Sequence, residues 1–132
     1  MKEIVKFIKE GLKITSKTKV DKKPKYNYHP KTKKELKNLI NQLIKERGNE
    51  GDFNDIDTSK ITDMTYVFDE MENFNGDISR WDVSNVTDMS YMFYYCLSFN
   101  QDISNWDVSN VNDGNNIFYN CPIEEKHKPK FK

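Results

Sequence analysis

NGDISRWDVSNVTDMSYMFYYCLSF, residues 75–99, is followed without a gap by NQDISNWDVSNVNDGNNIFYNCPIE, residues 100–124. The two segments are identical at 14 of 25 positions. A more divergent copy, GDFNDIDTSKITDMTYVFDEMENF, precedes them at residues 51–74 and keeps its apolar residues at the same offset of 25. Self-similarity at a fixed period of roughly 20–50 residues is typical of proteins whose supersecondary units stack on one another. We therefore predict three stacked repeats.

Two periods alternate within each copy. Apolar and polar residues alternate from Trp81 to Ser84, which indicates a short strand. Apolar residues then recur at spacings of three and four, as on one face of a helix, at Val86, Met89, Met92, Phe93 and Cys96. The predicted fold class is an α/β solenoid built from short strand–helix repeats like those of leucine-rich repeats.

One such unit cannot bury its own apolar face, so equivalent residues should form columns through the stack. The columns expected from the offset are Phe68, Phe93 and Phe118; Phe53, Ile78 and Ile103; and Ile56, Trp81 and Trp106.

The remaining segments flank the repeats of residues 51–123. Residues 1–24 are expected to form an amphipathic helix and a linker, and residues 124–132 a polar tail. Residues 25–50 are expected to cap the repeats with a strand at 25–28 and a helix at 32–47. Thr32 and Glu35 form a capping box, and Gly48 is a stop signal.

The repeats also resemble a known family. WDVSNVTDMSYMF, followed by FNQDISNWDVSNV, is similar to the BspA-type surface repeat, also called the mycoplasma lipoprotein surface repeat. The resemblance covers about residues 51–121, and residues 25–48 resemble the element that often precedes the first repeat. It implies a leucine-rich-repeat-like fold in a family of mostly uncharacterised binding surfaces from bacteria, mollicutes, protists and phages. This chain departs from the family pattern in having three repeats and no export signal.

The formal net charge of zero hides a strong polarity. Residues 1–48 carry a net charge of +10, residues 49–123 carry −12, and residues 124–132 carry +2. The basic part is almost entirely lysine, whereas arginine is preferred for base and phosphate recognition, so we disfavour nucleic acid as the partner. A nucleic-acid or anionic-surface binder acting through residues 1–48 stays as the alternative from another class. No apolar run reaches the roughly 18–20 residues of a membrane span.

The first 20 residues bear on location. Charged residues interrupt them throughout, unlike a signal peptide, and the two cysteines, Cys96 and Cys121, give no lipobox. We expect a cytoplasmic protein. Alternatively, MKEIVKFIKEGL resembles the packaging leader of internal proteins of large tailed phages, with a cleavage pattern at Ile8-Lys9-Glu10 before Gly11, which predicts a virion-associated protein. The other interpretation of this segment is a helix docked on the cap.

The sequence contains none of the common catalytic motifs that were sought. His29 and His127 lack metal-ligand spacing, and no phosphate loop, GxSxG or HExxH occurs, so we predict no enzyme, no cofactor and no metal. Cys96 and Cys121 occupy an apolar face and are expected to be reduced and buried. The aspartate columns, residues 57, 82 and 107 and residues 63, 88 and 113, could bind calcium, but turn and cap hydrogen bonds are favoured.

A protein-binding surface is the predicted function, with an unidentified protein as partner and a monomeric chain. Columns that change between repeats are the candidates for specificity, and tyrosine supplies contact area at low entropic cost. The alternative is that the tyrosines only cover the core. The predicted partner-binding residues are Asp55, Arg80, Asn105, Asp82, Asp107, Tyr66, Tyr91, Tyr94 and Tyr95.

Overall fold

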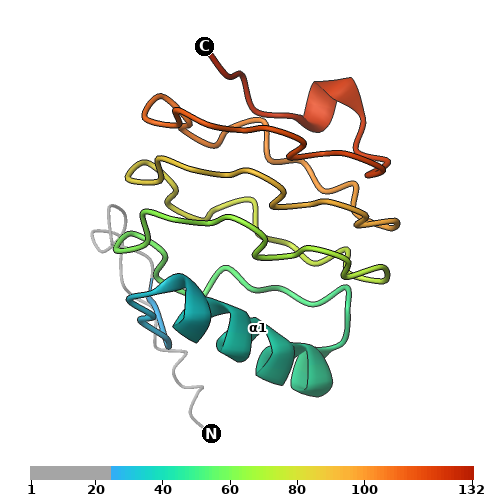
Figure 1. Ribbon diagram of the computed structural model, residues 1–132. Helices are drawn as coiled ribbons and strands as arrows, with labels where there is room; N and C mark the ends of the chain where they lie inside the picture. Colours follow the sequence, from blue (N-terminus) through green and yellow to red (C-terminus); the bar gives the residue numbers. More distant parts are fainter. Residues whose placement is uncertain (1–24) are drawn as a thin grey trace, which may run out of the picture.

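The computed structural model describes residues 25–132. The predicted helix and linker of residues 1–24, including the leader, lie outside this part of the chain. Residues 25–132 contain the α-helix α1 at Lys33–Arg47 and the 3-10 helix η1 at Glu125–His127. Three layers of chain are stacked between them, and α1 lies across one end of the stack (Figure 1). We call these layers coil 1 (51–74), coil 2 (75–99) and coil 3 (100–123).

The predicted α/β solenoid of strand–helix repeats is wrong. Residues 25–132 contain no sheet, and their β-pairing consists of isolated parallel bridges: Tyr28 with Ile56, Asp52 with Asp77, Asp63 with Asp88, and Asp88 with Asp113. No helix lies within the three coils either, in which turns alternate with short stretches that have no regular structure.

Consecutive β-turns replace the predicted helix of each repeat. In coil 2, the N–H groups of Met92, Tyr94 and Cys96 donate to carbonyl oxygens three residues earlier, at 3.1, 3.3 and 3.1 Å. Tyr91 and Tyr95 have φ values of 59° and 55°. A right-handed helix requires negative φ at every residue, so two left-handed residues within eight positions exclude it.

Other backbone donors in these turns bind the next coil instead of their own. The N–H of Phe68 donates to the carbonyl of Met92 at 2.9 Å, and the N–H of Phe93 donates to that of Ile117 at 2.9 Å. Hydrogen bonding between coils therefore satisfies groups that would otherwise need helical partners.

Short aspartate turns interrupt the predicted strands. One carboxylate oxygen of Asp82 accepts hydrogen bonds from the N–H and the hydroxyl of Ser84, at 3.0 and 2.6 Å. Such a contact closes a local turn between the aspartate and the residue two positions later, so the backbone cannot remain extended as a strand there. The same arrangement joins Asp57 to Ser59, Asp63 to Thr65, Asp77 to Ser79, Asp88 to Ser90, Asp102 to Ser104 and Asp107 to Ser109. The turn hydrogen bonds predicted for the two aspartate columns are confirmed at Asp57, Asp63, Asp82, Asp88 and Asp107.

The predicted side-chain columns are also confirmed. The ring of Phe93 stacks between Phe68 and Phe118, with centroids 5.2 and 5.6 Å apart. Trp81 and Trp106 stack at 6.5 Å with nearly parallel rings. Phe53, Ile78 and Ile103 are fully buried. Burial of each large apolar side chain stabilises the fold by about 1.5–3 kcal/mol, so the columns hold the coils together without a sheet.

The helix of the cap agrees with the prediction from the sequence, and the strand agrees with it less well. The hydroxyl of Thr32 accepts from the N–H of Glu35 at 3.2 Å, and Gly48 ends α1 at a φ of 85°. The carboxylate of Glu35 accepts from the N–H of Lys31 at 2.8 Å, completing the cap one residue before the expected position. The predicted strand at 25–28 is reduced to the single bridge between Tyr28 and Ile56.

Candidate functional site

Five tyrosine rings meet on one side of the coils. Tyr66 of coil 1 and Tyr91 of coil 2 are stacked with centroids 5.0 Å apart and an interplanar angle of 1°. Tyr94 contacts Tyr91 at 5.2 Å, Tyr95 at 4.7 Å and Tyr119 of coil 3 at 5.4 Å. We call these five residues the tyrosine surface. Tyr66 is 43% exposed and Tyr119 is 50% exposed, so the surface is open to a partner.

The backbone fixes this surface as much as the ring contacts do. Tyr66, Tyr91 and Tyr95 have φ values of 62°, 59° and 55°. Each is the third residue of a turn, and a type II turn requires positive φ there. The hydroxyl oxygen of Tyr91 accepts from the side-chain amide of Asn116 at 3.2 Å. The rings are therefore held in one arrangement before any partner binds.

The tyrosine surface offers phenol groups and has a lysine at its edge. Partial burial raises the pKa of Tyr94, and the adjacent Tyr95 and Tyr119 contribute further. Its hydroxyl therefore stays protonated at neutral pH and available as a donor. On the cap side, the ammonium group of Lys37 donates to the backbone carbonyl of Tyr66 at 3.1 Å.

Tyr119 was missing from the sequence-based candidates. It lies 25 residues after Tyr94, a spacing visible in the sequence, but the third copy is the most degraded. The stack of Tyr94 on Tyr119 shows that coil 3 continues the surface. The four predicted tyrosines are thus brought together with a fifth.

The other five predicted residues lie in a different part of each coil. Arg80, Asn105, Asp82 and Asp107 are exposed. The backbone N–H of Arg80 donates to the side chain of Asn54 at 2.8 Å. One oxygen of Asp107 accepts from Ser109, at 3.0 Å from its N–H and 2.7 Å from its hydroxyl. No described contact joins these residues to the tyrosine surface.

Asp55 is engaged within the cap. Its two carboxylate oxygens accept from the guanidinium of Arg47 at 2.8 and 3.0 Å, and one also accepts from Asn27 at 2.8 Å. These hydrogen bonds lower the pKa of Asp55 to about 2. The Asp55 side chain therefore links the end of α1 to coil 1. The replacement of this residue by Arg80 and Asn105 at the equivalent positions of the other repeats did not reveal this role.

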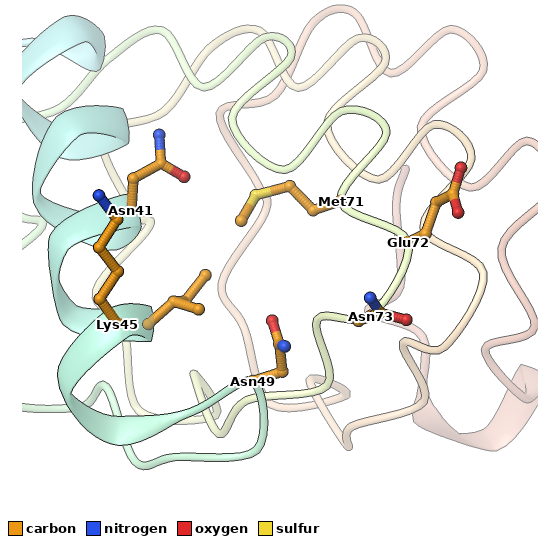
Figure 2. Close-up of a pocket in the computed structure, with 7 residues that line it drawn as sticks. Asn41, Lys45, Asn49, Met71, Glu72 and Asn73 are labelled. Carbon is orange, nitrogen blue, oxygen red and sulfur yellow. The ribbon is translucent and has the colours of Figure 1, made fainter.

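A shallow recess lies between α1 and coil 1. Figure 2 shows the side chain of Met71 extending toward the helix between Asn41 and Asn49. The recess has a volume of about 490 Å³ and is lined by Asn41, Ile44, Lys45, Asn49, Met71, Glu72 and Asn73. Its lining combines amides and single charges with the apolar side chains of Ile44 and Met71.

The cysteines and histidines are placed in separate environments. Cys96 is buried, and its burial raises the pKa of the thiol to about 12. Cys121 is half-buried, and both cysteines are free thiols. His29 lies 3.4 Å from the carboxylate of Asp57, and His127 lies 2.9 Å from Asn100. Among residues 25–132, no three His, Cys, Asp or Glu side chains are grouped to hold a metal ion.

Neither helix in the described part of the chain is long and apolar enough to span a bilayer.

The chain matches the model of a known protein family. The family described as "Mycoplasma protein of unknown function, DUF285" matches residues 34–128, which include α1, all three coils and η1. No curated protein and no solved structure matches the chain. The resemblance of the repeats to the mycoplasma surface repeat is thereby confirmed, and the chain belongs to the DUF285 family.

Proposed function

We propose that this chain is a non-catalytic protein-binding module whose contact surface is the tyrosine surface. The observation that carries the proposal is the contact of five tyrosine rings across three coils, with centroids 4.7–5.8 Å apart. Tyrosine is enriched where proteins bind proteins, because it buries a large area and keeps a hydroxyl for hydrogen bonding.

Rigidity supports the same function. Ordering a flexible side chain on binding costs about 0.5–1.5 kcal/mol. Tyr91 is already stacked on Tyr66 and hydrogen bonded to Asn116, so a partner meets rings that are largely ordered. Clusters of such preorganised aromatic side chains are typical of binding hot spots.

The test uses residues that the chain itself places at equivalent positions. Coil 3 has Asn116 and Asn120 where coil 2 has Tyr91 and Tyr95, and both asparagines have a φ of 55°. The double variant Tyr91→Asn, Tyr95→Asn therefore removes two rings while preserving the backbone. In affinity capture from the native host, the amount of specific partner bound by the variant should fall at least about tenfold, as expected for hot-spot residues. The melting temperature of the variant should change little.

A double variant of two exposed candidates away from the tyrosine surface, Arg80→Ala and Asn105→Ala, is the matched control and should keep the partner. Unchanged capture by the tyrosine variant would refute the proposed surface. Loss of the partner only in the control would move the contact to the columns of Arg80 and Asn105. Binding that weakens steeply with salt in both would instead support the Lys-rich anionic-surface alternative.

A further inference from the structure

The outer edge of coil 3 lacks the backbone hydrogen-bond acceptors that the equivalent edges of coils 1 and 2 find in the next coil. In coil 1, the N–H groups of Tyr66, Phe68 and Glu70 donate to carbonyl oxygens of coil 2, at 3.2, 2.9 and 2.7 Å. In coil 2, the equivalent N–H groups of residues 91, 93 and 95 donate to coil 3 at 3.0, 2.9 and 2.9 Å. The next set is Asn116, Phe118 and Asn120, whose N–H groups find no acceptor among residues 25–132. We call these three residues the open edge.

Elsewhere, segments that flank the coils complete the stack through backbone hydrogen bonds. At the first coil, the carbonyl of Tyr28 accepts from the N–H of Asp57 at 2.8 Å. At the last coil, the carbonyl of His127 accepts from the N–H of Ile103 at 3.0 Å. The tail beyond His127 approaches the open edge through a side chain, with the ammonium of Lys128 at 5.4 Å from the centroid of the Phe118 ring. Backbone pairing is thus the way in which this fold closes its ends, and the open edge is left without it.

A recess lies directly beside the open edge. Gly114 stands where coils 1 and 2 have the fully buried Met64 and Met89. A Cβ atom at Gly114 would meet nothing within 4 Å. The recess has a volume of about 520 Å³ and is lined by Val111, Asn112, Asp113, Gly114, Asn115, Phe131 and Lys132. It is large enough to receive one side chain of a bound segment.

A second copy of this chain does not fit the open edge. The matching carbonyl groups would be those at the other end of the stack, on residues 65, 67 and 69 of coil 1. There α1 covers the end (Figure 1), and the ammonium groups of Lys33 and Lys37 contact the Thr65 hydroxyl at 2.6 Å and the Tyr66 carbonyl at 3.1 Å. The occupant must offer a row of free carbonyl groups, which this covered end of a second copy does not.

We infer that the open edge binds an extended peptide segment of another protein. Carbonyl groups at alternate residues of the peptide accept hydrogen bonds from Asn116, Phe118 and Asn120, and one apolar side chain of the peptide fills the recess at Gly114. Unpaired N–H groups along a chain edge are a template for such strand addition. The inference is independent of the proposed function, since the tyrosine surface can bind a partner with the open edge vacant.

The chain itself supplies a probe. Residues 87–95, TDMSYMFYY, carry the carbonyl groups that pair with this edge in coil 1, and their Met89 would face the recess. In one experiment the free peptide is added at about 1 mM. In a second experiment the peptide is fused to residue 132 of the chain by a Gly/Ser linker, which gives an effective concentration on the order of millimolar. Amide hydrogen exchange measured by NMR should slow at least about tenfold at the three N–H groups of the open edge.

Two variants test the recess. Gly114→Trp should fill it and abolish the protection without lowering the melting temperature, because the added side chain starts in open space. Gly114→Ala should retain the protection, and Asn105→Trp, an exposed site elsewhere in coil 3, is the control for adding a tryptophan. Unslowed exchange in the tethered protein would overturn the inference. Protection that survives Gly114→Trp would overturn the part of it that concerns the recess.

Discussion

Six residues other than glycine have a φ between 55° and 62° in the three coils: Tyr66, Glu70, Tyr91, Tyr95, Asn116 and Asn120. The left-handed region costs most residues roughly 1–2 kcal/mol, while glycine and asparagine adopt it more easily. Coil 3 uses asparagine at both of its positions, and coils 1 and 2 use tyrosine or glutamate. The tyrosine surface is therefore built at an energetic cost in the backbone.

Glu70 gives a direct measure of that cost. Its side chain is exposed and forms no hydrogen bond or ion pair among residues 25–132, so Glu70→Asn should raise the free energy of unfolding by about 0.5–1 kcal/mol. Urea denaturation measures the change. Glu72→Asn, the same substitution at an exposed residue with ordinary backbone, is the control and should change stability little. Equal effects of the two substitutions would contradict a backbone origin.

At the scale of elements, Arg47 joins α1 to coil 1. Its guanidinium binds both oxygens of Asp55 and donates to the carbonyl of Asp52 at 2.8 Å. It also lies 5.9 Å from the ring centroid of Tyr28 and 6.0 Å from that of Phe53. Because this one side chain at the end of α1 contacts both Tyr28 and coil 1, the cap depends on it.

Arg47→Met should therefore lower the free energy of unfolding by about 1–2 kcal/mol, since it leaves the carboxylate of Asp55 without its main partner. Lys45→Met removes a positive charge from the same helix end without breaking an ion pair among the described residues, and it should cost much less. Thermal denaturation of both variants is the measurement. A loss of stability shared equally by the two would show that only the helix dipole is involved.

At the scale of the whole molecule, the aspartate turns set the response to acid. The pKa is lowered for seven aspartates: Asp55, Asp57, Asp63, Asp77, Asp102, Asp107 and Asp113. For Asp63 and Asp77 burial acts to raise the pKa, and hydrogen bonds from Thr65 and Ser79 outweigh it. The folded state therefore favours the charged carboxylates even though residues 49–123 carry a net charge of −12.

A group whose pKa is lowered by folding stabilises the fold above its unfolded value and loses that contribution as the pH falls through the folded value. The free energy of unfolding should therefore be nearly constant from pH 7 to about 5 and should fall steadily below about pH 4. Urea denaturation at pH 7, 4, 3 and 2 tests this, and Asp55→Asn should make the fall less steep. Stability that rises on acidification would mean that repulsion among the carboxylates dominates.

Local signals in the sequence predicted several features that the structure confirms. The offset of 25 located the aromatic columns, because equivalent residues of stacked repeats must meet. Thr32, the apolar stripe of α1 and Gly48 located the helix, because its caps and its buried face depend on neighbours within a few positions. The aspartate turns were likewise predictable, since each is closed within two residues.

By itself, then, the sequence determined the repeat period, the stacked columns, α1 and the family. Only the tertiary structure decided between turns and a helix after each Asp-x-Ser segment, since both place apolar residues at similar spacings. The turns prevail because the N–H groups of residues such as Phe68 and Phe93 find acceptors in the next coil. The pairing of Asp55 with Arg47, the extension of the tyrosine surface to Tyr119 and the open edge depend on the same long-range contacts, which no local pattern encodes.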